Sequence, residues 1–198
     1  IHQPVPVAGK MRGAYRILSI EDKGAEKGAI MRMEKRLVDA ESDSLCATVT
    51  QTLFLRGDGG QGGFGEPGQA LAPLPEREPD LVADIATMPQ IALVYRLSGD
   101  LNPIHADPAV ARSAGFDRPI LHGLCTMGLA ARALVDHLCE GAPERLRAMN
   151  VRFSRPVFPG ETIRTEFFTD GEIVRFRCRA VERDIIVVDR GQASIAPN

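Results

Sequence analysis

The sequence lacks several features that mark specialised classes of protein. No apolar run among its 198 residues is long enough to span a membrane, and no charged segment followed by an apolar one opens the chain. A basic surplus is also missing, since the formal net charge is −2. We therefore expect neither a nucleic-acid partner nor a membrane partner.

Cysteine motifs for metal or redox chemistry are missing as well. The four cysteines, Cys46, Cys125, Cys139 and Cys178, form no Cys-x-x-Cys pair, which argues against a zinc ribbon and a thioredoxin-like site. Buried free thiols are the expected alternative and are typical of a reducing compartment. Because the C-terminal sequence SIAPN is not a peroxisomal tripeptide, the sequence predicts a cytoplasmic protein.

The first half of the chain contains alternating apolar and polar residues. Segments 12–21, 29–38 and 44–56 show this period of two with Thr and Val enrichment, which predicts an antiparallel meander. A Gly/Pro-rich stretch follows at 57–75, where Gly57, Gly59 and Gly62 formally match G-x-G-x-x-G. No helix pattern follows to present its N-terminus to a pyrophosphate, so we interpret the stretch as a flexible connector.

The second half combines helix and strand patterns. Helices are predicted over 89–97, 107–115 and 123–139, and the last is the longest and is slim because it is rich in Gly and Ala. A short strand at 81–87 precedes them, and about four antiparallel strands follow. Arginines at 175, 177 and 179 alternate with apolar residues, and we interpret them as a solvent-facing side rather than a phosphate site. These patterns predict an α+β fold.

A weak internal repeat suggests how the chain is divided. Residues 4–9 and 156–160 are both Pro-rich, and each segment precedes three predicted strands. The simplest interpretation is two copies of one fold, of which the first is partial. We predict a degenerate repeat of strands only at 1–66, a Gly/Pro-rich linker at 67–79, and a complete catalytic domain at 80–198.

The chemistry is expected in segment 98–125, where Asp100 and His105 flank an Asn-Pro turn. On an α-helix, residues five apart point about 140° away from each other, so a helix would separate this pair. Pro103 instead forces Asn102 out of the α region. The resulting turn is able to bring a carboxylate and an imidazole together, as acid–base catalysis requires.

A second histidine, His122, is followed by Gly123 at the start of the longest predicted helix. A glycine there lets a ligand approach the free N–H groups and the positive end of the helix dipole. Such a site suits a developing oxyanion, for example a thioester carbonyl becoming an enolate. The alternative is that Gly123 only permits close packing, and the local pattern does not separate the two.

Two other kinds of site fit the sequence less well. A metal site would use the residues Asp100, His105, Asp107 and His122. The two histidines are not spaced as His-x-His or His-x-x-x-His, however, and no cysteine pair accompanies them, so we predict no metal. A Ser-His-Asp hydrolase is also disfavoured, because no G-x-S-x-G elbow is present.

Residues 98–124, SGDLNPIHADPAVARSAGFDRPILHGL, resemble the hydratase 2 motif of the MaoC-like dehydratase family, the (R)-specific enoyl-CoA hydratases. The similarity continues through RFSRPVFPGETIRTE and covers roughly residues 80–195. The segments PVPVAGK, DKGAEKGA and FLRGDGGQGGFG resemble the degenerate N-terminal repeat of the two-repeat members. The resemblance implies a hot-dog fold, an antiparallel sheet wrapped around a long central helix.

The resemblance also implies an activity, the reversible hydration of trans-2-enoyl-CoA to (3R)-3-hydroxyacyl-CoA, with no cofactor beyond the coenzyme A of the substrate. By motif position, Asp100 and His105 match the catalytic acid–base pair. Four further positions are expected to contact the water or the substrate: Asn102, which helps hold the water, Gly123, whose N–H meets the thioester oxygen, His122 and Leu124.

Two alternatives to this activity stay open at the level of sequence. The first alternative is a non-catalytic hot-dog subunit that binds acyl thioesters. The second is a dehydratase that acts on a carrier-protein-linked or specialised thioester. A homodimer is expected in each case, because pairing between sheets hides an edge strand.

Overall fold

A computed structural model describes residues 1–197 of the chain. It divides into two compact units, Ile1–Leu71 and Ala72–Asn198. We describe each unit by itself. The predicted assignment of 1–66 as a degenerate repeat, 67–79 as a linker and 80–198 as a catalytic domain stays a prediction.

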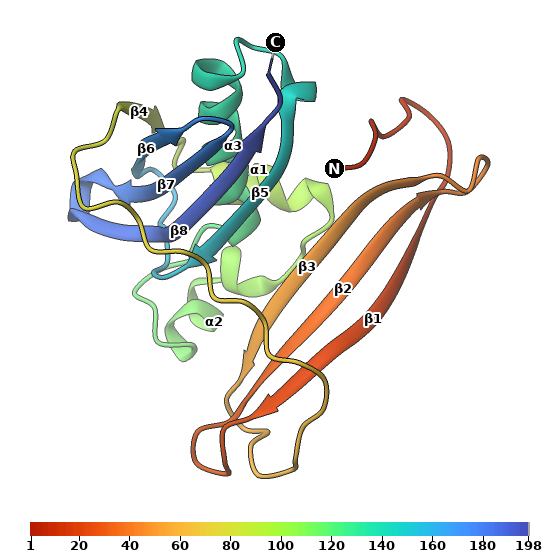
Figure 1. Cartoon of the computed structure of the whole chain (residues 1–198). Coiled ribbons are helices and arrows are strands. Elements are labelled where there is room, and N and C mark those ends of the chain that lie inside the picture. The colour runs from red at the N-terminus through yellow and green to blue at the C-terminus, as the bar shows by residue number, and fades with distance from the viewer. Residues whose placement is uncertain (198) are drawn as a thin grey trace. The chain divides into compact units, whose positions relative to one another are not determined.

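The first unit is a three-stranded antiparallel sheet (Figure 1), with strand order β1-β2-β3. The strands are β1 (Met11–Asp22), β2 (Ala29–Asp39) and β3 (Leu45–Leu55). All three predicted strands are therefore confirmed. Their register is continuous apart from one irregularity in each pairing, as expected where alternating side chains assign each residue to one face.

Part of the glycine-rich stretch after β3, residues 60–64, contacts the first sheet, which its interpretation as a flexible connector did not include. Phe64 forms an antiparallel bridge with Ile20 of β1, and the Asp22 carboxylate accepts the N–H groups of Gly60 and Gly62 at 2.7 and 2.6 Å. A Cβ atom on Gly63 would lie 2.3 Å from the Ile20 carbonyl oxygen. Gly63 therefore permits close contact between two backbones, which any side chain would prevent.

The second unit holds a five-stranded antiparallel sheet in the order β4-β6-β7-β8-β5. Its helices are α1 (Ile91–Tyr95), α2 (Pro108–Ser113) and α3 (Gly123–Leu138). Its strands are β4 (Leu81–Ala86), β5 (Leu146–Phe153), β6 (Thr162–Asp170), β7 (Ile173–Ala180) and β8 (Ile185–Ile195). Each predicted helix and strand of this half is present, with small shifts at the ends.

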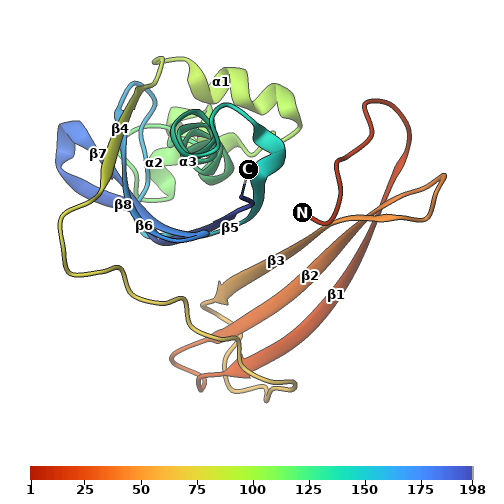
Figure 2. The same cartoon turned by 45° about the horizontal axis from the view of Figure 1, so that its top comes forward.

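Helix α3 lies on the concave side of this sheet. Figure 2 looks nearly along α3 and shows the sheet curving around it. Small buried residues, Ala130 and Ala133, let the helix approach the sheet, and the buried Phe167 and Phe176 complete the core. This arrangement confirms the predicted α+β hot-dog fold.

Alternation along β7 separates the core from the outer face of the sheet. Val174, Phe176, Cys178 and Ala180 are buried, whereas the arginines between them are partly exposed. Those arginines are not simply solvated, because Arg177 and Arg179 both form ion pairs with Glu166 of β6. The four cysteines are free and buried, as predicted. Among residues 1–197, no helix is both long and apolar enough to cross a membrane.

Candidate active site

The loop from Asp100 to His105 is a pair of consecutive turns. The Asp100 carboxylate accepts the N–H of Asn102 at 3.2 Å. The Asn102 side-chain oxygen then accepts the N–H of Ile104 at 3.2 Å and caps the short 3-10 helix Pro103–His105. Pro at the first helical position and a capping Asn are a favourable start for such a turn. The Asn102 side-chain amide keeps its N–H donors available for a bound molecule.

The orientation of His105 is defined by a main-chain carbonyl. Its Nδ1 atom lies 2.8 Å from the carbonyl oxygen of Ile120. Because a carbonyl oxygen only accepts hydrogen bonds, Nδ1 carries a proton in this contact. Ile120 is itself held by a bond of 3.4 Å from its N–H to the Ile104 carbonyl. The imidazole is 9% exposed.

Three of the predicted side chains converge. Asp100, His105 and His122 each offer one carboxylate oxygen or ring nitrogen, and these atoms lie within 4.8 Å of one another. The proposed turn therefore does bring Asp100 and His105 together. Asp107 does not join them, because its carboxylate caps α2 through the N–H of Ala109 at 2.7 Å.

His122 is the most enclosed member of this group. It is 1% exposed, and its ring stacks on that of His105 with centroids 3.7 Å apart. Its Nε2 lies 3.3 Å from the main-chain carbonyl oxygen of Asp100. Burial, and then the nearby His105, lowers the pKa of His122 below its ordinary value.

Gly123 is the first residue of α3, which is 16 residues long. It is exposed, and a Cβ atom built on it would lie 3.4 Å from the Phe153 ring. That is an ordinary contact distance, so packing does not by itself require glycine here. This favours the interpretation in which Gly123 leaves its N–H open to a ligand. Leu124 follows on the surface and is 61% exposed.

Two aromatic residues near the site were not among the predicted site residues. Tyr95 is the last residue of α1, and the centroid of its ring lies 4.7 Å from that of the His122 ring. Burial raises the pKa of the Tyr95 hydroxyl. Phe153 ends β5 beside Gly123 and is 48% exposed. Their sequence positions fit ordinary core residues, so only their tertiary contacts indicate a role.

A buried ion pair supports the segment that follows β5. Glu161, whose side chain is 5% exposed, pairs with Arg183 and accepts the N–H of Phe158 at 2.8 Å. Arg183 also donates to the Pro156 carbonyl at 2.7 Å. Within the same segment, the Val157 carbonyl accepts the N–H of Leu121 at 2.7 Å. The ion pair thus stabilises the segment that binds the main chain of Leu121, the residue directly before His122.

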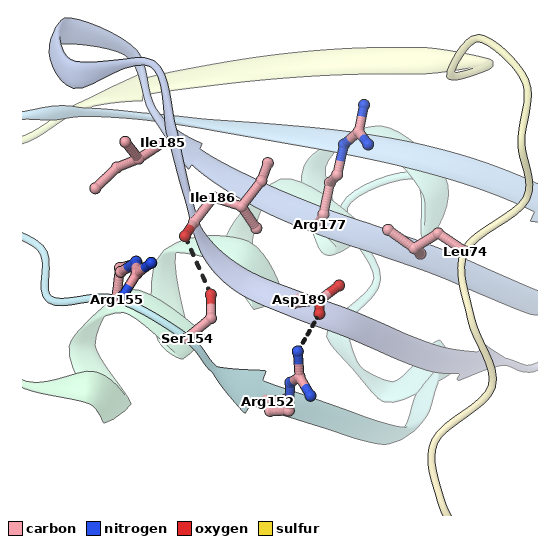
Figure 3. A pocket seen from close by; sticks show the side chains of 8 residues that line it. All are labelled: Leu74, Arg152, Ser154, Arg155, Arg177, Ile185, Ile186 and Asp189. Carbon is pink, nitrogen blue, oxygen red and sulfur yellow. Dashed lines mark hydrogen bonds and ion pairs between the residues drawn. The ribbon is translucent and has the colours of Figure 1, made fainter.

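A separate cavity of about 630 Å³ lies on the outer face of the sheet (Figure 3). Three arginines and one aspartate line it, together with Ser154 and three aliphatic side chains: Arg152, Arg155, Arg177, Asp189, Leu74, Ile185 and Ile186. Arg152 is bound to Asp189, whereas the Arg155 guanidinium has no carboxylate partner among residues 1–197. The lining is therefore basic and suits an anionic group.

Part of the chain matches a known family, and similar proteins exist. Residues 70–190 match the model of the MaoC like domain. The "3-hydroxyacyl-thioester dehydratase Y" of Mycobacterium tuberculosis is 48% identical over 166 residues, which are 83% of this chain and 57% of that protein. The peroxisomal "Enoyl-CoA hydratase 2" of Arabidopsis thaliana is 39% identical over 197 residues, which are 95% of this chain and 63% of that protein.

A solved structure agrees with this match. The MaoC-like dehydratase from Phytophthora capsici superposes with a TM-score of 0.93 at 38% identity, and the alignment covers 99% of this chain and 68% of that one. The chain spans only 57% and 63% of the two curated relatives named above. The family model and the superposition together establish that the chain belongs to the MaoC-like dehydratase family.

Proposed function

We propose that this chain carries the active site of an (R)-specific enoyl-CoA hydratase, which also catalyses the reverse dehydration. The observation that supports this most is the convergence of Asp100 and His105 beside the exposed first turn of α3. Two relatives are named an enoyl-CoA hydratase and a 3-hydroxyacyl-thioester dehydratase. Those names describe the two directions of one reaction.

In the proposed reaction, each of these residues contacts either the attacking water or the thioester substrate. A water molecule is held between the Asp100 carboxylate and Nε2 of His105, and the Asn102 amide donates to it. The water oxygen bonds to C3 of the enoyl group while one O–H bond of the water breaks, and the C2–C3 π electrons move towards the thioester. The acid–base pair takes the released proton and returns one proton to C2. The thioester oxygen, which gains negative charge, accepts the N–H of Gly123, and Leu124 lies against the substrate.

Coenzyme A is the proposed carrier of the thioester, rather than a carrier protein. The basic cavity that Arg155 lines suits the phosphates of the nucleotide. A carrier-protein substrate would need a protein contact surface instead. Comparing the hydration of crotonyl-CoA with that of the same acyl group on a carrier protein tests this choice directly.

The experiment that tests the function is a direct assay of the purified chain with crotonyl-CoA. Hydration removes the conjugated double bond, so the absorbance of the enoyl thioester falls with time, and chiral analysis of the product gives the (3R) isomer. Tight binding with no loss of this absorbance would support a non-catalytic thioester-binding subunit instead.

We propose that no cofactor takes part. The three converging side chains have a geometry that a cation would accept as well, so this part of the proposal needs its own test. Dialysis against a chelator, followed by assay in metal-free buffer, is expected to leave the rate unchanged. Recovery of a lost rate on adding a divalent cation would contradict it.

A homodimer and a cytoplasmic location complete the proposal. Strands β4 and β5 are the two edges of the five-stranded sheet, and edge pairing between copies would satisfy their free backbone groups. Light scattering of the purified chain measures the oligomeric state. The Arabidopsis relative is named as peroxisomal, so imaging of the tagged full-length protein in its own cells tests the location.

A further inference from the structure

His122 is enclosed by the groups that it would have to orient. Its ring is stacked on His105 at 3.7 Å with 26° between the planes, and the Tyr95 ring packs against it at 4.7 Å. Because only 1% of the residue is exposed, it has almost no surface to offer to a substrate. A role through its neighbours fits this burial better than direct contact.

The hydrogen bonds of His122 define its neutral form. Nε2 faces the Asp100 carbonyl oxygen at 3.3 Å and therefore carries the proton. Nδ1 is buried and has no hydrogen-bond partner within residues 1–197. A second proton on Nδ1 would be a buried donor without an acceptor, which is costly. Of the charged groups nearby, His105 and Arg96 also disfavour the cation, and only Asp100 favours it.

The main chain of His122 connects the ring to α3. Its carbonyl accepts the N–H groups of Cys125 and Thr126 at 3.1 and 3.2 Å, which makes it the N-cap residue. The next residue is Gly123. One buried residue thus contacts the Asp100 main chain and the His105 ring, and it caps the helix whose first residue, Gly123, is exposed.

We propose that His122 is a positioning residue, which holds the Asp100 main chain and the His105 ring in the relation that hydration needs without touching the reacting atoms. This inference rests on the proposed hydratase function. Small displacements of such groups lower the reaction rate strongly, since a shift of about 1 Å reduces it by about a hundredfold.

Two substitutions separate the two contacts. His122→Phe keeps a ring to stack on His105 but removes the donor to Asp100, whereas His122→Gln keeps a donor at the same distance along the side chain but removes the ring. We expect each to lower kcat for crotonyl-CoA by about 10- to 100-fold with KM changed less than about threefold. His137→Gln is the matched control, because His137 is an exposed histidine of the same helix.

A double-variant measurement distinguishes positioning from other roles. If His122 acts through His105, then His122→Gln adds little further loss in the His105→Asn background. Multiplied losses there would overturn the inference. So would a raised KM at constant kcat, which indicates substrate contact, or a lower melting temperature at constant kcat, which indicates packing alone.

A readout without substrate keeps this inference independent of the hydratase proposal. The ring-proton NMR signal of His105 is expected to change in position in both His122 variants, because both remove a contact of the His122 side chain. An unchanged signal in both would overturn the positioning role. If the variants show this NMR change but the wild-type chain does not hydrate crotonyl-CoA, only the proposed function is refuted.

Discussion

The Nδ1 atom of His105 lies 2.8 Å from the carbonyl oxygen of Ile120, fifteen residues further along the chain. This contact decides which ring nitrogen stays available, because the Ile120 carbonyl accepts the proton on Nδ1 and Nε2 is then the nitrogen left for a substrate water. The orientation of the His105 ring is thus defined by the backbone.

Conservative substitutions at the two proposed catalytic positions, Asp100 and His105, should remove activity without unfolding the protein. His105→Asn keeps a donor for the Ile120 carbonyl but has no atom in place of Nε2, and Asp100→Asn keeps an acceptor for the Asn102 N–H. We expect each to lower kcat by about 10²- to 10⁴-fold. Asp107→Asn, which changes only the cap of α2, should keep its activity. Near-normal turnover in the first two variants would refute the catalytic assignment.

Stability and activity should respond in opposite directions at Gly123. Gly123→Ala places a methyl group 3.4 Å from the Phe153 ring, so the fold is expected to persist and to be as stable or more so. The methyl group hinders approach to the N–H, and kcat is expected to fall by about tenfold or more. Gly128→Ala is the control, because a Cβ there has no atom within 4 Å. It should raise stability at constant activity, and equal activity in both variants would contradict the prediction.

The basic cavity predicts a substrate-dependent effect of Arg155. Removing one exposed cation from a phosphate contact costs about 1 kcal/mol, so Arg155→Gln should raise KM for crotonyl-CoA about three- to tenfold. KM for crotonyl-pantetheine, which lacks the nucleotide, should stay the same. Arg132→Gln removes an exposed arginine of α3 and serves as the control. An equal rise in KM for both substrates would contradict the prediction that the nucleotide binds in the cavity lined by Arg155.

The buried ion pair should matter for stability far more than exposed pairs do. Glu161→Ala removes the carboxylate that accepts from the Phe158 N–H and pairs with Arg183, whose guanidinium keeps only the Pro156 carbonyl as an acceptor within residues 1–197, and we expect about 3 kcal/mol of destabilisation. Asp136→Ala breaks the exposed pair with Arg132 and should cost less than about 0.5 kcal/mol. Urea unfolding of the three proteins measures the difference, and similar midpoints in all of them would contradict the prediction.

The four buried thiols should be inert in the native protein. Burial raises the pKa of Cys178 from 9.0 to about 12, and burial also raises the pKa of Cys125 and Cys139. We expect no reaction with a disulfide reagent at pH 8 until the chain is unfolded, and then four equivalents of thiol. Rapid reaction of any thiol in the native state would contradict this burial.

The raised pKa of Cys178 predicts how the stability of the protein changes with pH. The folded state keeps the Cys178 proton after the unfolded state has lost it, so this contribution is complete below pH 9 and declines as pH rises towards 12. Urea midpoints should therefore fall over this range. They should fall less steeply in Cys178→Ala than in the wild-type chain. Identical slopes for the two proteins would contradict the shift.

Sequence patterns were sufficient for the elements and for the central turn. Alternation at 173–180 assigned Phe176 to the core and Arg177 to the outer face, because a strand places successive side chains on opposite faces. The step from Asn102 to Pro103 excluded a helix between Asp100 and His105. These inferences depend only on neighbours within a few residues, which is the range over which propensity and period act.

The tertiary structure decided what distant residues do to each other. Three such contacts depend on how β1, β5 and α1 meet other segments. Gly63 packs on the Ile20 carbonyl, Phe153 lies beside Gly123, and the Tyr95 ring packs against His122. No local pattern reports such contacts, since they arise from sheet register and packing in three dimensions. The sequence by itself predicted which residues carry the chemistry, and packing decided that the second histidine is buried beside the first.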